Sequence, residues 1–350
     1  MKSVKHSTAS IFSTAMAPLL ALSLLAANAK AQSYTVIDLT PGAGNATATS
    51  VSGGVAAGSS AAGIFSTAAR ATVWDASGAT DLHPTSLDDA ATGITGRSYI
   101  YSISGNLQVG SGAGPTTANR LTPLLWRGTA ASAVALSVPF TNFGGQAQST
   151  DGIQIVGYAT GQDKDGAAIA GPAHAMLWDA ATGAATDLGD GGGGAMAYGV
   201  GGGQQVGYVI KTQASAALWR GSRQSLVSLH PKAAVVSVAS DTDGTRQVGY
   251  AGYDIRVRQE AAKGNKYQRF TYATLWSGTD LSAVSIHPYP VNMPAGVNFT
   301  QSYALGIKGT QIAGYAGDQN KFGTPAYSHA IVWDVATLES VDLNAFLPAG

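Results

Sequence analysis

Histidine and aspartate are the residues whose types and spacing in this sequence suit acid–base or metal chemistry. Three of the six histidines, His83, His230 and His287, stand between an aliphatic residue and a proline. A proline there ends a strand, so this motif predicts a turn that recurs around a repeat, and the three would share a metal only if all faced one axis. His174 and His329 belong to a second motif, His-Ala-x-x-Trp, and are interpreted as repeat consensus.

The aspartates recur just as regularly, in Trp-Asp and Asp-Leu motifs. Such recurrence predicts turn hydrogen bonds, whereas a catalytic acid would be an exception to the repeat, and no Asp or Glu stands out in that way. Two Asp-x-Asp-Gly stretches, 163–166 and 241–244, resemble fragments of a calcium loop without its remaining ligands. We therefore expect no cofactor, with calcium as the alternative. The repeated aspartates are Asp75, Asp179 and Asp334, and Asp38, Asp81, Asp187 and Asp342.

Other reaction chemistries lack their motifs in this sequence. It has no Gly-x-Ser-x-Gly elbow, no phosphate-binding loop, no His-Glu-x-x-His and no cysteine. Lys+Arg and Asp+Glu number 20 each, so no net field attracts a nucleic acid or an anionic membrane. We predict no catalytic, cofactor-binding or metal-binding residue and no nucleic-acid partner.

One basic segment, from Asp254 to Tyr272, departs from this composition. Long loops on rigid scaffolds often carry function, so the segment is a candidate partner-binding loop, with a plain solvated loop as the alternative. The neighbouring repeat unit crosses the same place in far fewer residues, which predicts an insertion outside the repeat that is removable without loss of folding. Its candidate binding residues are Arg256, Arg258, Lys263, Lys266, Tyr267 and Arg269.

Six tryptophans reveal the repeat that must position these groups. Each closes a short apolar run, and their spacing is 41 to 57 residues, in or just beyond the range of propeller blades. An aliphatic residue follows about ten residues later, and a Gly-Tyr or Gly marker comes some thirty to forty residues after each of the first five tryptophans. Each unit then holds four candidate strands. The tryptophans are Trp74, Trp126, Trp178, Trp219, Trp276 and Trp333, and the marker tyrosines are Tyr158, Tyr208, Tyr250 and Tyr315.

The pattern of these strands favours an all-β fold, a β-propeller. The Trp strands are apolar at successive positions, as expected when neighbouring sheets cover both faces. The tryptophans are therefore interpreted as packing between blades and not as sugar-stacking platforms, and the marker tyrosines as structural. The chain opens and closes in mid-unit, so we predict six four-stranded blades closed by pairing of the N- and C-terminal strands. A surplus Asp-Leu marker leaves seven blades or an unclosed ring as alternatives.

The first 31 residues have the pattern of a secretory signal peptide. Lys2 and Lys5 precede an apolar stretch, 17–27, and Ala29-Lys30-Ala31 offers a cleavage site before Gln32. The stretch is far shorter than the ~20 residues that span a membrane. We predict a signal peptide over 1–31, a single propeller domain over 32–350, and a secreted, periplasmic or extracellular monomer without a membrane anchor.

The repeat units resemble the HAF-type extracellular repeat family of bacteria, whose units read His-Ala-Phe-Leu-Trp, Thr-Asp-Leu-Gly and Gly-Gln-Val-Val-Gly-Tyr. The closest copy reads HAMLW at 174–178, TDLG at 186–189 and QVGY at 205–208, and HAIVW at 329–333 is the next. The resemblance implies secretion and a propeller-like fold. It brings no catalytic residues.

These observations favour a secreted, non-enzymatic binding or structural module of the envelope or extracellular space, whose ligand could be a polysaccharide or a protein. The alternative is a propeller hydrolase or lyase that acts on extracellular polysaccharide. That alternative requires an acidic cluster drawn from different blades onto one face of the ring, which a sequence does not display.

Overall fold

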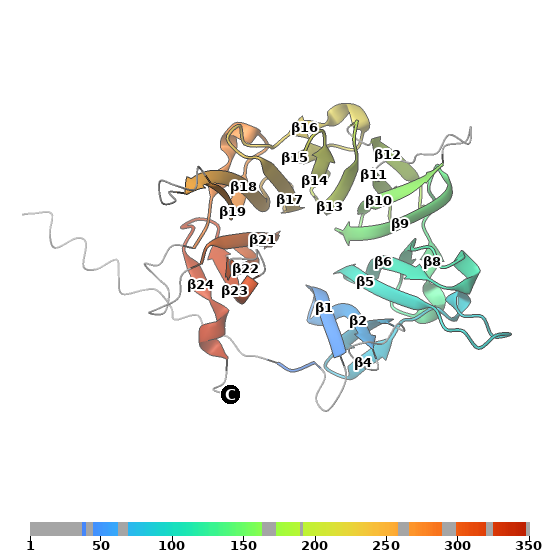
Figure 1. Cartoon of the computed structure of the whole chain (residues 1–350). Coiled ribbons are helices and arrows are strands. Elements are labelled where there is room, and N and C mark those ends of the chain that lie inside the picture. Colours follow the sequence, from blue (N-terminus) through green and yellow to red (C-terminus); the bar gives the residue numbers. More distant parts are fainter. Residues whose placement is uncertain are drawn as a thin grey trace, which may run out of the picture. The chain divides into compact units, whose positions relative to one another are not determined.

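The computed structural model describes residues 37–39, 45–61, 69–162, 173–189, 192–257, 266–288, 299–319 and 325–347. The chain divides into two units, 1–36 and 37–350. The first unit, with the expected signal peptide, lies outside the described residues. In the second, six antiparallel sheets of four strands form a ring, so the prediction of a six-bladed β-propeller is confirmed (Figure 1).

Each blade is built from four consecutive strands that run from the centre of the ring outward. Blade 1 is β1 (Asn45–Ser52), β2 (Val55–Ala61), β3 (Arg70–Asp75) and β4 (Gly78–Asp81). Blade 2 is β5 (Arg97–Ser104), β6 (Leu107–Ala113), β7 (Thr122–Trp126) and β8 (Val134–Ala135). Blade 3 is β9 (Thr141–Thr150), β10 (Gln154–Gln162), β11 (His174–Asp179) and β12 (Ala185–Gly189).

The second half of the ring repeats the same order. Blade 4 is β13 (Ala195–Gly201), β14 (Gln204–Ile210), β15 (Ala214–Trp219) and β16 (Val227–Ser228). Blade 5 is β17 (Val236–Thr242), β18 (Gln247–Val257), β19 (Lys266–Trp276) and β20 (Val284–Ser285). Blade 6 is β21 (Gln301–Lys308), β22 (Gln311–Gln319), β23 (Pro325–Asp334) and β24 (Ser340–Asp342). Short 3-10 turns lie at η1 (Thr85–Leu87), η2 (Pro115–Thr117), η3 (Ala130–Ser132), η4 (Arg223–Ser225), η5 (Asp280–Ser282) and η7 (Leu343–Phe346).

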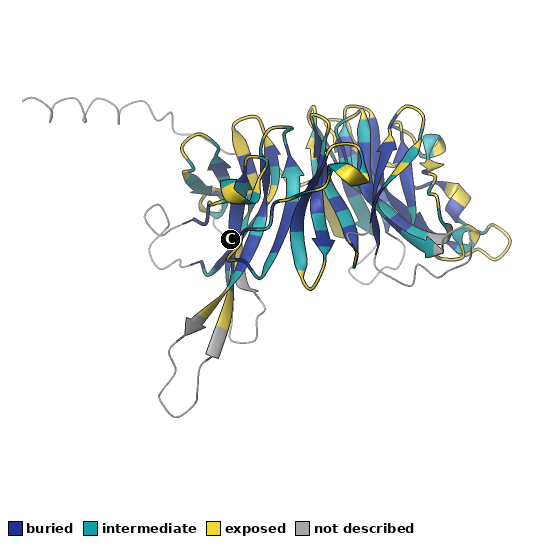
Figure 2. Ribbon diagram, turned by 90° about the horizontal axis from the view of Figure 1, so that it is seen from above, coloured by how far each residue is buried: buried dark blue, intermediate teal, exposed yellow. Residues whose placement is uncertain are grey.

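The tryptophans pack between blades, as predicted. All six are buried, at 4% exposure or less. Trp126 packs with Leu82 of blade 1 and Trp178 with Leu125 of blade 2, so each belongs to a core shared with the preceding blade. In blade 3, the Trp strand β11 is buried at its first five residues, and buried segments fill the interior of the ring in Figure 2. Because both faces are covered, these strands need apolar residues at successive positions.

The glycine of each marker allows two strands to approach closely. A Cβ on Gly157 would lie 1.9 Å from the carbonyl oxygen of Gln146 on the inner strand, far inside van der Waals contact. The inner strand shifts its register at that point. The same contact recurs in all six blades, so each marker glycine is a point of close backbone approach. The six glycines are Gly58, Gly110, Gly157, Gly207, Gly249 and Gly314.

The way the ring closes differs from the prediction. The first and last blades each consist of their own consecutive strands, and the described residues of the N-terminal strands pair with none of β21 to β24. The chain does not need a mixed blade, because β1 and β2 already pair with the first Trp strand, β3. The surplus marker at Ile37–Leu39 is not a strand.

The facing sides of blade 6 and blade 1 are exposed where other blades are packed. Ala313 and Ala330, on the side of blade 6 that would meet a next blade, are exposed, whereas Val248 and Ala273 at the same repeat positions of blade 5 are fully buried. On the inner strand of blade 1, Val51 is 71% exposed. In the described part of the ring, this seam is therefore packed less than the junctions between consecutive blades.

Candidate functional site

The three Leu/Ile-His-Pro histidines connect neighbouring blades and do not form a metal site. The Nδ1 of His287 lies 2.8 Å from the Oγ of Ser302 on the next inner strand, and that hydroxyl accepts a hydrogen bond from the backbone N–H of Ala273. His83 with Ser98 and His230 with Ser237 repeat the arrangement. Burial lowers the pKa of His287, which suits a neutral imidazole with a structural role.

The other two histidines pair with the Asp-Leu aspartates across adjacent strands. The Nδ1 of His174 lies 3.0 Å from a carboxyl oxygen of Asp187, and that of His329 lies 2.6 Å from Asp342. In blade 1 an arginine, Arg70, takes the place of the histidine and binds Asp81. The residue type changes while the pairing stays, so the motif holds the blade together.

The repeated aspartates make the turn hydrogen bonds that the sequence predicts. Asp179 accepts from the N–H of Thr182 at 2.8 Å, and Asp187 from that of Gly189 at 2.7 Å. Of the two calcium-like stretches, 163–166 lies outside the described residues. In the other, Asp243 binds the side chain and N–H of Arg246. The described residues contain no group of three or more His, Cys, Asp or Glu placed to hold a metal ion.

Asp241 is the acid that the sequence analysis missed. Serine or glycine stands at the same position of the other inner strands, yet we had regarded Asp241 only as part of a calcium-like stretch. Its carboxyl oxygen accepts a hydrogen bond from the N–H of Ile307 on the next blade at 2.9 Å. Burial raises its pKa to about 6. A comparison of the bulge positions across the six repeats would have singled it out.

The basic segment is part of a β-hairpin, so its prediction as a loop inserted outside the blades was wrong. β18 and β19 pair without a break from Gln247 with Trp276 to Val257 with Lys266, and each is 11 residues long. The corresponding strands of blade 4 have 7 and 6 residues. Figure 2 shows the hairpin extending beyond the other blades.

The structure describes only some of the candidate binding residues. Arg269 is described, and its guanidinium binds Asp254 across the hairpin at 2.8 Å. Arg256, Lys266 and Tyr267 are placed in the strands, but their side chains are outside the described set, as are Arg258 and Lys263 entirely. The hairpin is therefore shown as an extended arm, while its predicted role in binding stays a prediction.

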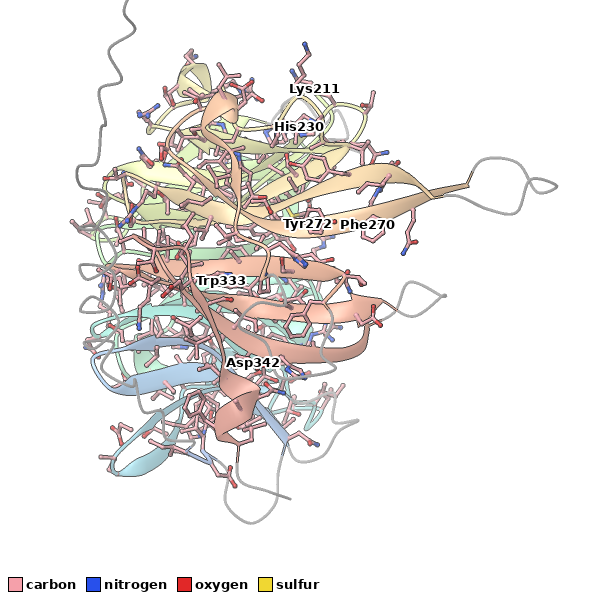
Figure 3. The ribbon with its side chains drawn as sticks, turned by 90° about the vertical axis from the view of Figure 1, so that its left-hand side faces the viewer. Lys211, His230, Phe270, Tyr272, Trp333 and Asp342 are labelled. Carbon is pink, nitrogen blue, oxygen red and sulfur yellow. The ribbon has the colours of Figure 1, made fainter. Side chains whose placement is uncertain are left out.

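Aromatic side chains lie where the hairpin leaves the ring. The ring of Tyr272 lies 6.2 Å from that of Tyr253, 6.4 Å from that of Phe270 and 4.7 Å from the imidazole of His287. Figure 3 shows Phe270 and Tyr272 along β19. Ile255, one step further out, is 43% exposed. From Tyr253 and Phe270 toward the ring, the hairpin packs within the blade. From Ile255 outward, it is exposed to solvent.

A second group of aromatic residues connects blades 2 to 6, and we call it the tyrosine belt. The rings of Tyr250 in blade 5 and Tyr303 in blade 6 are 5.0 Å apart, and those of Tyr303 and Tyr315 are 4.8 Å apart. In blade 4 the rings of Tyr198 and Tyr208 are 5.7 Å apart. The belt consists of Tyr101, Tyr158, Tyr198, Tyr208, Tyr250, Tyr303 and Tyr315.

The belt is half-buried and uncharged. Burial raises the pKa of Tyr158 and Tyr250 above the usual value, and neighbouring phenols in the belt raise it further. All seven tyrosines are intermediate in exposure. Four of them are the marker tyrosines that we had interpreted as structural. Their recurrence was the signal, and what the sequence did not show is that successive copies come together.

The fold defines this chain as a six-bladed β-propeller. No family model matches it, and no curated protein matches it. A solved puromycin hydrolase is similar at TM-score 0.47 and 13% identity, over 78% of this chain and 41% of that one. The putative TolB of Agrobacterium tumefaciens is similar at TM-score 0.40 and 14% identity, over 63% of this chain and 74% of that one. The chain thus spans about two fifths of the hydrolase's length, and likeness at this level assigns no residue role.

Within the described residues, no helix combines the length and the hydropathy that a membrane crossing requires.

Proposed function

We propose that this propeller is an exported, non-enzymatic binding module of the HAF-type repeat family that contacts an anionic partner of the envelope or extracellular space through the β18–β19 arm. The partner we propose is an acidic polysaccharide. Export rests on the signal-like pattern of residues 1–31, and family membership rests on the HAMLW, TDLG and QVGY units.

The observation that carries the proposal is the unbroken pairing of β18 with β19 out to Val257 and Lys266. A paired hairpin holds its side chains on a rigid support, so a partner meets them without first ordering a loop. The segment from Asp254 to Tyr272 carries five of the 20 Lys and Arg residues of the chain against two acidic residues, Asp254 and Glu260. One of the acids, Asp254, already binds Arg269. The arm is therefore a basic element on a neutral molecule.

The alternative, a polysaccharide hydrolase or lyase, has less support. Glycoside hydrolysis commonly uses two carboxyl groups on either side of the bond to be cleaved. Asp241 has the raised pKa of a general acid, but its carboxyl oxygen is bound to Ile307 in the junction between blades 5 and 6. We therefore base the proposal on binding.

The arm is tested with polygalacturonate immobilised on a biosensor surface. The triple variant Arg256→Gln, Arg258→Gln, Lys263→Gln should bind at least about tenfold more weakly than the wild type at low salt, because it removes three charges that attract the anionic polymer. High salt screens the same attraction and should weaken binding of the wild type by a similar factor.

The matched control removes three charges elsewhere, in Lys211→Gln, Arg220→Gln and Lys232→Gln, and should bind within about twofold of the wild type. Lys211 is labelled at the edge of blade 4 in Figure 3. Equal losses in both triple variants would show a general charge effect and contradict the role of the arm.

N-terminal sequencing of the protein from the culture medium or periplasm should begin at Gln32; a chain that keeps Met1 there would contradict the processing.

A further inference from the structure

We propose that the tyrosine belt is a binding site for a neutral glycan at the centre of the ring. This site is separate from the β18–β19 arm and does not depend on the arm's function. It rests on the position of the seven tyrosines and on the unpaired hydroxyls of three of them, Tyr158, Tyr250 and Tyr315.

The strands that carry the belt place it on the inner side of the propeller. Tyr101, Tyr198 and Tyr303 lie on the innermost strands β5, β13 and β21, and the other four tyrosines lie on the strands next to the innermost ones. The pKa of Tyr198 in blade 4 is raised by burial and by the phenols of Tyr208, Tyr250 and Tyr158, which come from three different blades. Blades diverge outward, so one side chain comes close to three of them only where they converge. Tyr158 in turn interacts with Tyr101 of blade 2 and Tyr208 of blade 4. The phenols therefore follow the inside of the ring from blade 2 to blade 6.

Several hydroxyl groups of the belt are available to a ligand. Tyr101 is hydrogen-bonded to Ser111 and Tyr303 to Gln301, at 3.1 Å each. The hydroxyls of Tyr158, Tyr250 and Tyr315 have no hydrogen-bond partner among the described residues. These three hydroxyls are not among the fully buried polar atoms that lack a partner, so solvent or a ligand can reach them. A half-buried phenol of this kind satisfies its hydroxyl with solvent or with a bound polar molecule.

The charges around the belt favour a neutral ligand. Burial and neighbouring phenols cause the raised pKa of Tyr158, Tyr250 and Tyr315, with no carboxylate among the causes. Burial raises the pKa of Tyr101, and the guanidinium of Arg97 acts in the opposite direction. Side-chain amides lie close by: Gln146 is the strand partner of Tyr158 and binds Gln148.

A glycan matches this combination of surfaces. Each sugar ring has an apolar C–H face for an aromatic ring and hydroxyl edges for phenols and amides. A platform repeated from blade to blade also suits a ligand made of repeated units. A neutral peptide is the other ligand of mixed character, and the experiment distinguishes the two.

The experiment uses titration calorimetry of the full-length protein with three neutral hexasaccharides: cellohexaose, maltohexaose and hexa-N-acetylchitohexaose. We expect saturable binding of at least one, unchanged by high salt. Tyr158→Ser and Tyr250→Ser should each weaken it at least about fivefold, since each removes one aromatic contact. These substitutions suit the fold, because Ser59 and Ser111 occupy the same repeat position in blades 1 and 2.

Two further variants keep the test decisive. Tyr253→Ser, which lies on β18 with Tyr250 but outside the belt, should bind within about twofold of the wild type. Tyr158→Phe keeps the ring and the packing, and should lose only the part of the affinity that its hydroxyl supplies.

Three outcomes would overturn the proposal. The first is no saturable binding of any hexasaccharide, and the second is equal binding by the wild type and both Tyr→Ser variants. The third is saturable binding of decaproline that the two variants abolish while the hexasaccharides do not bind, which would assign the belt to peptides.

Discussion

At the scale of single residues, the histidines and aspartates that could do acid–base or metal chemistry mainly hold neighbouring strands and blades together. His287 links two blades through Ser302, and Asp187 holds both a turn and His174. Repetition explains why these residues recur without converging: equivalent positions in a ring point to equivalent neighbours, not to one point. The exceptions to the repeat, such as Asp241, are where residues with a single role are to be sought.

The tryptophans differ from one another in one hydrogen bond. The indole N–H of Trp126 donates to the carbonyl oxygen of the buried Leu82 at 2.9 Å, whereas that of Trp219 has no partner among the described residues. Trp126→Phe leaves this buried carbonyl unpaired, so it should cost about 1–2 kcal/mol more than Trp219→Phe. Urea denaturation of the two variants measures the difference. Equal losses would show that the hydrogen bond contributes nothing net.

Asp241 makes stability depend on pH. Its pKa is about 6 in the folded protein, above the ordinary value of a carboxyl group, so folding favours the protonated form. The protein should therefore lose stability as the pH rises from about 4 to about 6. Asp241→Asn keeps an oxygen acceptor for Ile307; it should match the wild type near pH 4 and be more stable at pH 8 by about 1–2 kcal/mol.

Asp243 provides the control of opposite sign for this experiment. Burial acts to raise its pKa, but hydrogen bonds from Arg246 and Thr245 outweigh it and hold the pKa below the ordinary value. Asp243→Asn should therefore lose stability at pH 8 and regain parity with the wild type in acid. If Asp241→Asn showed this same profile, the carboxyl of Asp241 would be stabilised as an anion and the assignment would be wrong.

At the scale of elements, the sequence predicted strands well and the extent of the arm poorly. The six Trp strands and the marker glycines are recognisable because both are imposed by backbone and packing constraints that every blade repeats. The arm, from Asp254 to Tyr272, has no such repeat to compare with, and its charges resemble those of a loop. Pairing between β18 and β19 follows from register, which starts at Gln247 and Trp276 and simply continues.

Shortening the arm should separate its two parts. Replacing residues 256–267 by an Asn-Gly turn keeps the aromatic contacts of Tyr253 and Phe270 with Tyr272, and should leave the melting temperature within about 2 °C of the wild type. A deletion that also removes Phe270 should lower the melting temperature, because it takes away part of the packing next to His287. Thermal denaturation followed by circular dichroism compares the two, and equal melting temperatures would contradict the boundary.

At the scale of the whole ring, blade 1 is unlike the other blades in two respects. Its described strands contribute no tyrosine to the belt, and the inner strand β1 is largely exposed. The sequence predicted a ring of six blades from the count of tryptophans. It did not predict the seam, because exposure at Ala330 depends on where a neighbour lies and not on residue type: Ala273, the same residue type at the same repeat position of blade 5, is fully buried.

Two equivalent positions measure how tightly the seam is packed in solution. Ile103 on β5 is 5% exposed and packs against blade 1, while Val51 occupies the same place on β1 and is 71% exposed. Ile103→Ala should therefore cost about 2–4 kcal/mol of unfolding free energy, and Val51→Ala less than about 0.5 kcal/mol. Urea denaturation gives both values on one protein. A cost for Val51→Ala close to that of a buried valine would mean that blade 6 covers blade 1 in solution and that the seam is a packed junction like the other five.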